Sequence, residues 1–403
     1  MKPGRLVVAS MLLLAALGAH RAGAADLAFS PDEVRRIARH GPWPAPPAGD
    51  PGNRFSTQPE AIALGQQLFF DPRLSANGDM SCASCHRPAL AFGDGLARSV
   101  GAVVLDRNAP SLWNAALQRW HGWDGAADSL WSQAIRPLLD PREMAGSAQH
   151  ITDMFTSDPD LGCRYTRAFG KAPALEDAPA VLVHSAKAIG AFVASLRSAP
   201  SAFDRFRAAL VRPVRGNRGT YPLAAQRGLK TFIGKGGCAN CHAGAMFSNG
   251  EFADIGIPFF VRPGVVDPGR HGGIVALRQN SYNLLGPHAD TQPDSVTMKT
   301  RHVALQHRNF GEFKVPSLRN AAHTAPYMHD GQLATLEAVV DHYSDLNLDR
   351  LHANGETLLK PLRLTSAEKS DLVAFLNSLS APDATTWRAR PLPACKPVRR
   401  PAR

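Results

Sequence analysis

The sequence has few cysteines, no collagen-like repeat and, beyond one near the N-terminus, no long apolar run. Six cysteines in 403 residues are too few for a small protein built on disulfides. The 34 glycines and 32 prolines follow no Gly-X-Y period, which excludes collagen and predicts a globular chain rich in loops. Because 44% of the residues are hydrophobic and 20% are charged, most of the chain can fold, and its length predicts two domains.

Acidic residues are also in deficit, since 34 Asp and Glu face 45 Lys and Arg, a formal net charge of +11. A basic chain could bind nucleic acid or a membrane surface. The excess is at the ends, however: residues 1–24 hold three basic residues and residues 388–403 hold six, both without an acid, which leaves +2 for the body. We therefore expect no nucleic-acid binding. The basic tail is interpreted as a solvated end, with a dock for an acidic partner as the alternative.

The N-terminus has the pattern of a secretory signal. Lys2 and Arg5 precede an apolar run from Leu6 to Leu17, and the small residues of 22–24 follow it. The run is too short to span a bilayer well, although an uncleaved anchor is the alternative. No other long apolar run follows, so no stable membrane span is expected. Cleavage near Ala24 would export the chain, in a bacterium most simply to the periplasm.

Four of the six cysteines lie in two C-x-x-C-H motifs. These are Cys82-Ala83-Ser84-Cys85-His86 and Cys238-Ala239-Asn240-Cys241-His242. The pattern is typical of covalent c-type haem, where two thiols form thioethers to the porphyrin and the adjacent histidine binds the iron. A thiol redox pair or a four-thiolate zinc site are the alternatives. An exported chain with two complete motifs favours two covalently bound c-type haems.

The remaining two cysteines are Cys163 and Cys395. An exported protein allows them to form a disulfide, which would tether the basic tail to the first half of the chain. They could equally be two free thiols. We favour the disulfide.

Apolar residues at helical spacing recur around each motif, and few segments alternate like strands. The sequence therefore predicts a mostly α protein with two cytochrome c-like haem domains, long loops and little β structure. Helices are expected near Pro31–Arg39, at Ala61–Phe70, through Leu182–Leu196, at Leu223–Ile233, and through Leu372–Leu379 with a cap at Thr365 or Ser366. The expected segments are a signal at 1–24, a Pro/Gly-rich arm at 25–55, a first haem domain at 56–212, a second at 222–383 and a tail at 384–403, with a linker at 212–221.

Several further motifs accompany the haem motifs. The first half contains Arg107–Asn114, Gly122–Gly125 and then Gln133, Pro137 and Glu143; the second contains Val315–Asn320, Ala325–Gly331 and Thr335–Glu337. Together these motifs closely resemble the bacterial dihaem cytochrome c peroxidase and MauG family. The resemblance extends from about Ser56 to Pro382, and its specificity lies in the combination of motifs.

The resemblance implies a role for each matching position. His86 would be the proximal ligand of an N-terminal, peroxide-reacting haem, and His242 that of a C-terminal, electron-transfer haem. Trp123 matches the tryptophan between the two haems. The distal pocket of the first haem would be lined by Gln133, Pro137 and Glu143.

The chemistry of these residues suits the implied roles. A carboxylate in a dry pocket, here Glu143, can take a peroxide proton and deliver it to the leaving oxygen. Trp123 could accept a hole between redox centres, and Pro137 would keep distal space free by its shape. Each also has a purely structural alternative: a surface glutamate at a helix start, a core tryptophan, and for Gln133 a hydrogen bond to a buried backbone group.

The resemblance also implies a calcium site between the domains. Its ligands would be Asn108 and the carbonyls of Thr324 and Pro326. Asn108 is a suitable calcium ligand by type, but an Asn before Ala-Pro is also an ordinary turn residue. His329, in the His-Asp-Gly turn, is expected to be structural.

Two departures from the peroxidase pattern affect the expected iron ligands. Family peroxidases carry a histidine in the loop after the first motif, whereas Phe92–Asp106 contains none. The first haem is therefore expected to be five-coordinate as isolated. Fourteen residues after His329, where peroxidases place methionine and MauG-type enzymes tyrosine, stands Tyr343. A phenolate ligand would lower the potential of the second haem; Met298 or His342 are the alternative ligands.

The leading functional hypothesis is a periplasmic oxidoreductase of the cytochrome-c peroxidase type. Hydrogen peroxide would be cleaved at the His86 haem, with electrons from a small cytochrome c or cupredoxin relayed through the His242 haem and Trp123. The alternative is a MauG-type oxidase that modifies a protein substrate through a high-valent bis-haem state. A third hypothesis is a non-catalytic dihaem electron carrier. The sequence leaves the oligomeric state open, a homodimer included.

Overall fold

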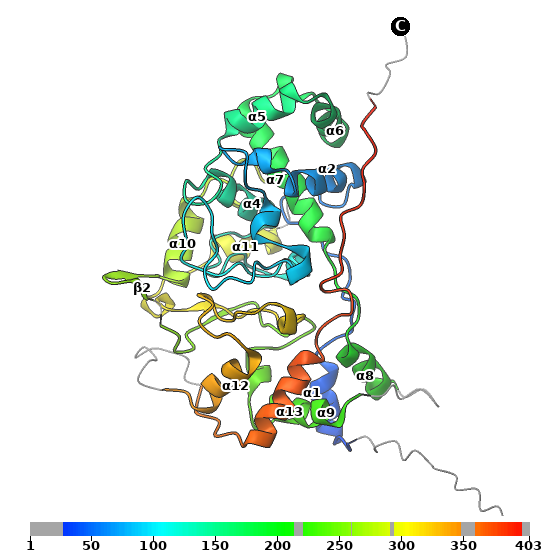
Figure 1. Cartoon of the computed structure of the whole chain (residues 1–403), viewed down its shortest axis with the longest axis vertical. Helices are drawn as coiled ribbons and strands as arrows, with labels where there is room; N and C mark the ends of the chain where they lie inside the picture. Colours follow the sequence, from blue (N-terminus) through cyan, green and yellow to red (C-terminus); the bar gives the residue numbers. More distant parts are fainter. Residues whose placement is uncertain (1–26, 213–220, 259, 291–293, 348–358, 397–403) are drawn as a thin grey trace, which may run out of the picture.

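A computed structural model describes residues 27–212, 221–258, 260–290, 294–347 and 359–396 of the chain. The expected signal segment and most of the expected linker lie outside these residues. The described chain is elongated (Figure 1). Helices α2, α4, α5, α6 and α7 form its upper half in this view, and α1, α8, α9, α12 and α13 form its lower half.

The secondary structure is almost entirely helical. The α-helices are α1 (Pro31–Ala38), α2 (Pro59–Phe69), α3 (Cys82–Cys85), α4 (Leu130–Leu139), α5 (Ala148–Ser157), α6 (Pro159–Phe169), α7 (Ala178–Ser195), α8 (Ala202–Val211), α9 (Leu223–Ile233), α10 (Arg270–Gln279), α11 (Asp294–Arg301), α12 (Leu336–Ser344) and α13 (Ser366–Asn377). Short strands β1 (Phe252–Ala253) and β4 (Phe313–Lys314) pair antiparallel, as do β2 (Phe260–Arg262) and β3 (Val265–Val266). The expectation of a mostly α protein with little β structure is confirmed.

The helices expected from apolar spacing are present with small shifts at their ends. Their starts follow local chemistry: the Asp177 side chain accepts from the Ala180 amide at the N-cap of α7, and Pro179 occupies the first turn. Thr365 and Glu368 form a capping box at the start of α13. The last helix therefore begins at the cap that the sequence indicated. The helix predicted to run to Leu196 ends one residue earlier, at Ser195.

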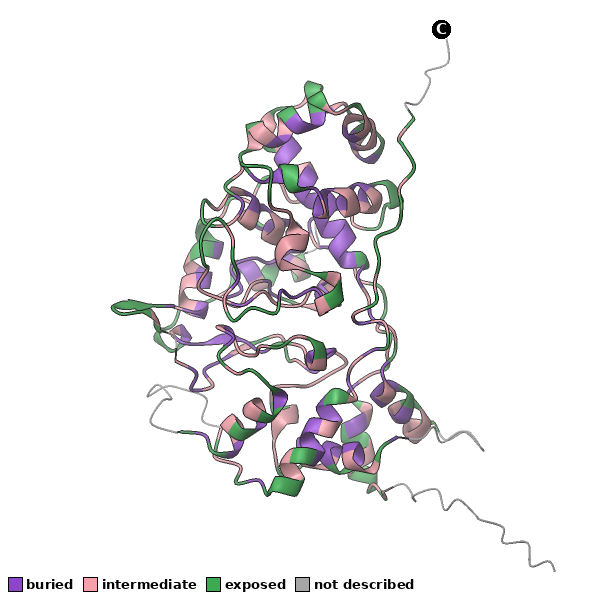
Figure 2. Ribbon diagram, in the orientation of Figure 1, coloured by how far each residue is buried: buried purple, intermediate pink, exposed green. Residues whose placement is uncertain are grey.

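Two hydrophobic clusters form the core, one in each half. In the first cluster α2 crosses α7 so closely that a Cβ on Gly65 would lie 1.9 Å from the carbonyl oxygen of Ala188. In the second, α9 crosses α13 in the same way, and a Cβ on Gly228 would lie 1.9 Å from the carbonyl oxygen of Asp371. A glycine is therefore required at each crossing. The two halves repeat one packing unit, and Figure 2 shows buried residues concentrated at both crossings.

Among the described residues, α7 alone has the length and mean hydropathy of a membrane span. It is an interior helix, since 72% of it is buried within the protein and it packs against α2, α4 and α5.

Chain segments cross between the two halves. Phe203 and Phe206 of α8, on the N-terminal side of the expected domain boundary, belong to the second cluster, as does Ile37 of α1. In the opposite direction, Arg270 of α10 donates to the Asp124 and Gly125 carbonyls in the first half. The domain limits expected from the sequence stay a prediction. The buried residues of the first cluster all lie within 55–196, whereas the second cluster also takes residues from before the expected boundary.

The described part of the C-terminal tail lies on the protein surface with its basic side chains, Arg388, Arg390 and Lys396, exposed. Cys395 and Cys163 form a disulfide, as predicted, and the tail runs from α13 along the edge of the upper half (Figure 1). The Trp387 ring packs against the first cluster. For the described residues 384–396 the expectation of a solvated basic tail therefore holds, because Arg388, Arg390 and Lys396 stay exposed while the Trp387 ring and the disulfide tether the chain.

Candidate haem sites

The first C-x-x-C-H motif forms a single helical turn, α3, that ends on its histidine. The His86 amide donates to the Cys82 carbonyl at 2.9 Å, and His86 Nδ1 lies 3.0 Å from the Phe92 carbonyl oxygen. A carbonyl at this distance accepts an N–H from Nδ1, which fixes the tautomer and leaves Nε2 with a free lone pair. Burial lowers the pKa of His86, so the ring is neutral, the form that binds a metal.

The second motif repeats this arrangement. The His242 amide donates to the Cys238 carbonyl at 2.9 Å, and His242 Nδ1 lies 2.9 Å from the Phe247 carbonyl oxygen. Burial again lowers the pKa of this histidine. Each half therefore offers two thiols and one oriented imidazole in the same local geometry.

A cavity of about 390 Å³, here called the first cavity, lies over His86. Its wall brings together four residues that the sequence singled out: His86, Trp123, Gln133 and Glu143. In the described part of the chain the wall includes Arg136 and Asp140, on either side of Pro137 in sequence, but not Pro137 itself. Pro137 acts on α4 instead, where it lacks the amide that would bond the Gln133 carbonyl.

Two polar groups of the first cavity are suited to bind a small oxygen species. The Gln133 Oε1 atom is buried and has no hydrogen-bond partner among the described residues, so it can accept from a ligand. Burial and the nearby Asp140 carboxylate raise the pKa of Glu143, although Arg136 and Arg142 oppose them. A carboxyl with a raised pKa holds its proton more readily than an ordinary glutamate, which suits a group that takes up and releases a proton.

A cavity of about 270 Å³, the second cavity, lies over His242. Its wall includes Cys238, Cys241, His242 and the Tyr343 ring from α12. Burial raises the pKa of the Tyr343 phenol. Neither alternative ligand shares this wall among the described residues: Met298 is 51% exposed on α11, and His342 Nε2 lies 2.8 Å from the Ile255 carbonyl oxygen.

The two cavities share a wall centred on Trp123. Trp123 lines both cavities, its indole N–H donates to the Asn108 carbonyl at 2.9 Å, and its own carbonyl accepts from the Lys314 amide at 2.8 Å. Asn108 thus fixes the indole ring and Lys314 fixes the backbone of Trp123, in the wall that lies between the cavities of the two histidines.

Sequence reasoning gave no role to two buried charged groups beside Trp123, Lys314 in the shared wall and Asp124 in the wall of the first cavity. The Lys314 side chain is buried, lines both cavities and donates to the Gln118 side chain and the Trp120 carbonyl. Burial lowers the pKa of Lys314 to about 8. Asp124 is also buried; burial would raise the pKa of its carboxyl, but Arg107 and Arg136 hold it below the usual value. The only signal was position, since Asp124 lies within the Gly122–Gly125 motif and Lys314 directly precedes the Val315–Asn320 motif.

The expected calcium ligands come together only in part. The Asn108 amide nitrogen donates to the Leu96 carbonyl at 3.0 Å and to the Pro326 carbonyl at 3.3 Å. Asn108, Thr324 and Pro326 all line the second cavity. With this amide orientation Asn108 presents donors where a cation requires oxygen, so calcium binding would require the amide to turn over.

Each cavity fits one c-type haem on three observations. Cys238 and Cys241 line the second cavity, and Cys85 lines the first with Cys82 one helical turn away. The histidine Nε2 is free to bind iron, and in the first cavity a buried acceptor lacks a partner. A mostly helical chain with two such cavities and a shared tryptophan wall defines a dihaem c-type protein.

Comparisons with known proteins agree with that class. The sequence model of the di-haem cytochrome c peroxidase family, CCP_MauG, matches residues 59–210. Methylamine utilization protein MauG of Methylorubrum extorquens is 37% identical over 328 residues, 81% of this chain and 80% of that protein. Cytochrome-c peroxidase IdrP1 of a Pseudomonas species is 33% identical over 345 residues, 84% of this chain and 85% of that protein.

Solved structures share the fold. A MauG-like protein associated with microbial copper homeostasis has a TM-score of 0.67 at 27% identity and covers 86% of this chain and 96% of its own. The diheme peroxidase BthA of Burkholderia thailandensis has a TM-score of 0.65 at 24% identity, with 85% of this chain and 91% of its own covered. The chain belongs to the di-haem cytochrome c peroxidase and MauG family; it is an oxidoreductase of the peroxidase type that holds two haems.

Proposed function

We propose that the protein reduces hydrogen peroxide to water in the first cavity with electrons that enter through the second. The observation that carries the proposal is the first cavity itself, where Gln133 and Glu143 face the space over His86 and Trp123 separates it from the space over His242. Cys82, Cys85, Cys238 and Cys241 would hold the two haems covalently, with His86, His242 and Tyr343 as axial ligands.

When bound, the haems supply the iron that breaks the O–O bond and the redox centres that pass electrons. The protein manages the protons. Glu143 as a carboxylate takes a proton from peroxide and returns it to the departing oxygen, while Gln133 Oε1 accepts a hydrogen bond from the peroxide O–H and orients it. Two electrons and two further protons then complete the conversion of one peroxide to two waters.

Electron transfer between the sites depends on the shared wall. The Trp123 indole N–H donates to the Asn108 carbonyl and its backbone carbonyl accepts from the Lys314 amide, so the first bond orients the ring and the second fixes the chain that carries it. Asp124, next in sequence, offsets the charge of Arg107 and Arg136 close to the ring. The wall therefore provides a fixed, low-dielectric path for the electrons.

The cellular setting follows from the same proposal. The periplasm suits a chain with an N-terminal signal pattern, two covalent haems and a Cys163–Cys395 disulfide. The electron donor would be a small cytochrome c or cupredoxin. Two haem domains, near 56–212 and 222–383, and a calcium ion at Asn108, Thr324 and Pro326 belong to the proposal as well.

A MauG-type oxidase is the second candidate. It is favoured by Tyr343 in the wall of the second cavity and by the absence of histidine from Phe92–Asp106. In that case the electrons that re-reduce the oxidised haems would come from a residue on a partner protein, which is thereby modified, and not from a small electron-donor protein.

Steady-state turnover separates the two candidates. The holoprotein is mixed with hydrogen peroxide and a reduced small cytochrome c, and cytochrome oxidation is followed optically. Oxidation of two cytochromes per peroxide at many turnovers per second supports the peroxidase. A slow reaction that leaves a long-lived oxidised protein would contradict it and favour the protein oxidase.

The resting oxidised holoprotein is expected to contain one high-spin, five-coordinate haem and one low-spin haem. The reason is that Phe92–Asp106 offers no histidine to fill the distal side of the first haem. Optical and EPR spectra of the protein before any reductant is added measure this directly, and peroxide should react without prior reduction. Two low-spin signals in the resting state would contradict the prediction.

A further inference from the structure

The turn after each haem motif has backbone strain. Phe92 and Phe247, whose carbonyls accept from His86 and His242, have φ of 61° and 51°, and Ala91 has φ of 52°. Residues with a Cβ rarely adopt this left-handed region, and they remain there only when their surroundings hold them. The groups that pack against the two phenylalanine rings therefore determine where both carbonyls point.

The Phe92 ring is held by the C-terminal tail. It is fully buried, and its neighbours include Trp113 at 5.3 Å and Trp387 at 5.4 Å between ring centroids. Trp387 also stacks on Phe70 at 6.0 Å with an interplanar angle of 9°. The Trp113 indole N–H donates to the Ala384 carbonyl at 2.9 Å, so both tryptophans connect the tail to the turn behind His86.

The tail is fixed along its length on the first half. Arg390 exchanges two hydrogen bonds with the Gln66 side chain, at 2.7 and 3.2 Å. The Cys395 amide donates to Asp160 at 2.6 Å, and the disulfide to Cys163 attaches the tail covalently to α6. Trp387 is thereby held between α13 and a covalent anchor.

The Phe247 ring is held by the other end of the chain. His40, which follows α1 in the N-terminal arm, is 2% exposed and stacks on Phe247 at 4.6 Å and 12°. His40 Nδ1 lies 3.2 Å from the Gly244 carbonyl oxygen, which also accepts the Phe247 amide at 3.0 Å. Burial lowers the pKa of His40 to about 4, so the stacked ring is neutral.

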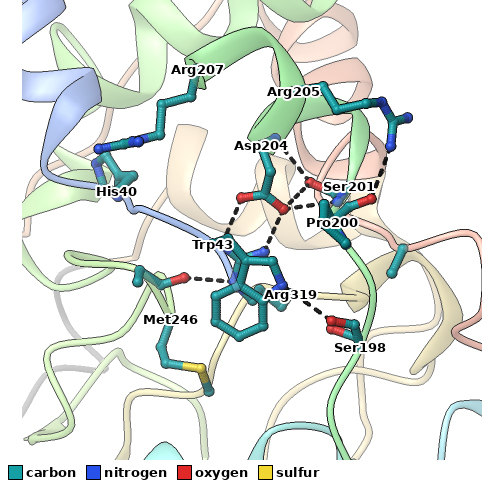
Figure 3. A network of polar contacts seen from close by, with 12 residues as sticks. His40, Trp43, Ser198, Pro200, Ser201, Asp204, Arg205, Arg207, Met246 and Arg319 are labelled. Carbon is teal, nitrogen blue, oxygen red and sulfur yellow. Dashed lines mark hydrogen bonds and ion pairs between the residues drawn. The ribbon is translucent and has the colours of Figure 1, made fainter. Parts of the chain in front are cut away.

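The arm is anchored next to this stack by a buried ion pair. Arg319 bonds both carboxylate oxygens of Asp204 at 2.9 Å, and Trp43 of the arm covers the guanidinium at 3.6 Å from its ring centroid (Figure 3). Figure 3 also shows His40 near this network, beside Arg207. The arm is thus attached at a defined place on the protein, as the tail is.

We propose that each chain end positions the proximal histidine of the distant half: the disulfide-anchored tail acts on His86 through Trp387 and Phe92, and the N-terminal arm acts on His242 through His40 and Phe247. Trp387 and His40 are positioning residues, since they act through the phenylalanine turns. The inference rests on the proposed haem ligation by His86 and His242. It does not depend on which reaction the first cavity performs.

Substitution of the two positioning residues, Trp387 and His40, should have separate effects on the two haems. In the holoprotein, Trp387→Ala should shift the reduction midpoint and the iron–histidine stretching frequency of the high-spin haem and leave the low-spin haem unchanged. His40→Ala should shift the midpoint and EPR g-values of the low-spin haem alone. Trp387→Phe, which keeps an aromatic ring against Phe92, should restore most of the first shift. Spectroelectrochemical titration with resonance Raman and EPR spectra measures these effects without turnover.

The disulfide provides a test that leaves every core side chain in place. The double variant Cys163→Ser, Cys395→Ser should shift the high-spin haem in the same direction as Trp387→Ala, by a smaller amount, and should make the tail accessible to trypsin at the Arg388–Ala389 bond. If Trp387→Ala fails to fold, this variant decides for the tail.

Three results would overturn the proposal: unchanged midpoints and spectra in the folded variants, both haems shifting together, or a freed tail with an unperturbed first haem. Loss of peroxide turnover with unshifted spectra would count against the positioning role. If the variants shift the spectra as expected but the wild-type holoprotein itself does not turn over peroxide, the result would count against the proposed function instead.

Discussion

Replacing Glu143 by Gln is expected to lower kcat/KM for peroxide by about 10²- to 10⁴-fold, the range typical of losing a general acid/base. The glutamine keeps the size and polarity of the side chain in the wall of the first cavity, but it cannot accept a proton from peroxide. Haem content and resting spectra should be unchanged, because Glu143 is no iron ligand. Stopped-flow measurement of the peroxide reaction at several concentrations gives the rate constant.

The pH profile tests the same residue. Burial and Asp140 raise the pKa of Glu143, and only the carboxylate can accept the first proton. The wild-type kcat/KM should therefore fall as the pH drops through this raised pKa, and the limb should be absent from Glu143→Gln.

Asp140→Asn is the matched variant for this profile. It removes one cause of the raised pKa, so the limb should move to lower pH while the rate on the plateau is retained. A limb that persists in Glu143→Gln would assign it to another group.

The sequence predicted the parts of the site that local motifs specify. Each C-x-x-C-H motif folds as one turn with its histidine at the end. The spacing from Trp123 to Glu143 brings Trp123 and two of the three expected distal residues, Gln133 and Glu143, to one cavity, because they lie on or next to one helix, α4. The Cys163–Cys395 disulfide could be stated as a preference because only two cysteines remained. These inferences needed no knowledge of long-range packing.

Long-range packing decides what the sequence could not predict. Trp387 and His40 lie in Pro-rich ends without helical spacing, and each packs against the half of the protein remote in sequence. Lys314 is a charged residue in a two-residue strand, and its burial follows from β1–β4 pairing beside Trp123. Net charge in the tail predicted that its basic side chains face solvent, as they do, but one tryptophan and one disulfide determine where the chain lies.

Replacing Tyr343 by Phe is expected to abolish the low-spin signal of the second haem, because phenylalanine has no donor atom to bind iron from the wall of the second cavity. The signal should be retained in Met298→Leu and His342→Gln, since Met298 is half exposed on α11 and His342 contacts Ile255. Tyr343→Met should keep a low-spin haem but raise its midpoint, because a thioether favours ferrous iron where a phenolate favours ferric iron. Low-temperature EPR of the resting oxidised holoproteins, followed by redox titration, distinguishes these outcomes. An unchanged signal in Tyr343→Phe, or its loss in either control, would move the ligand to another residue.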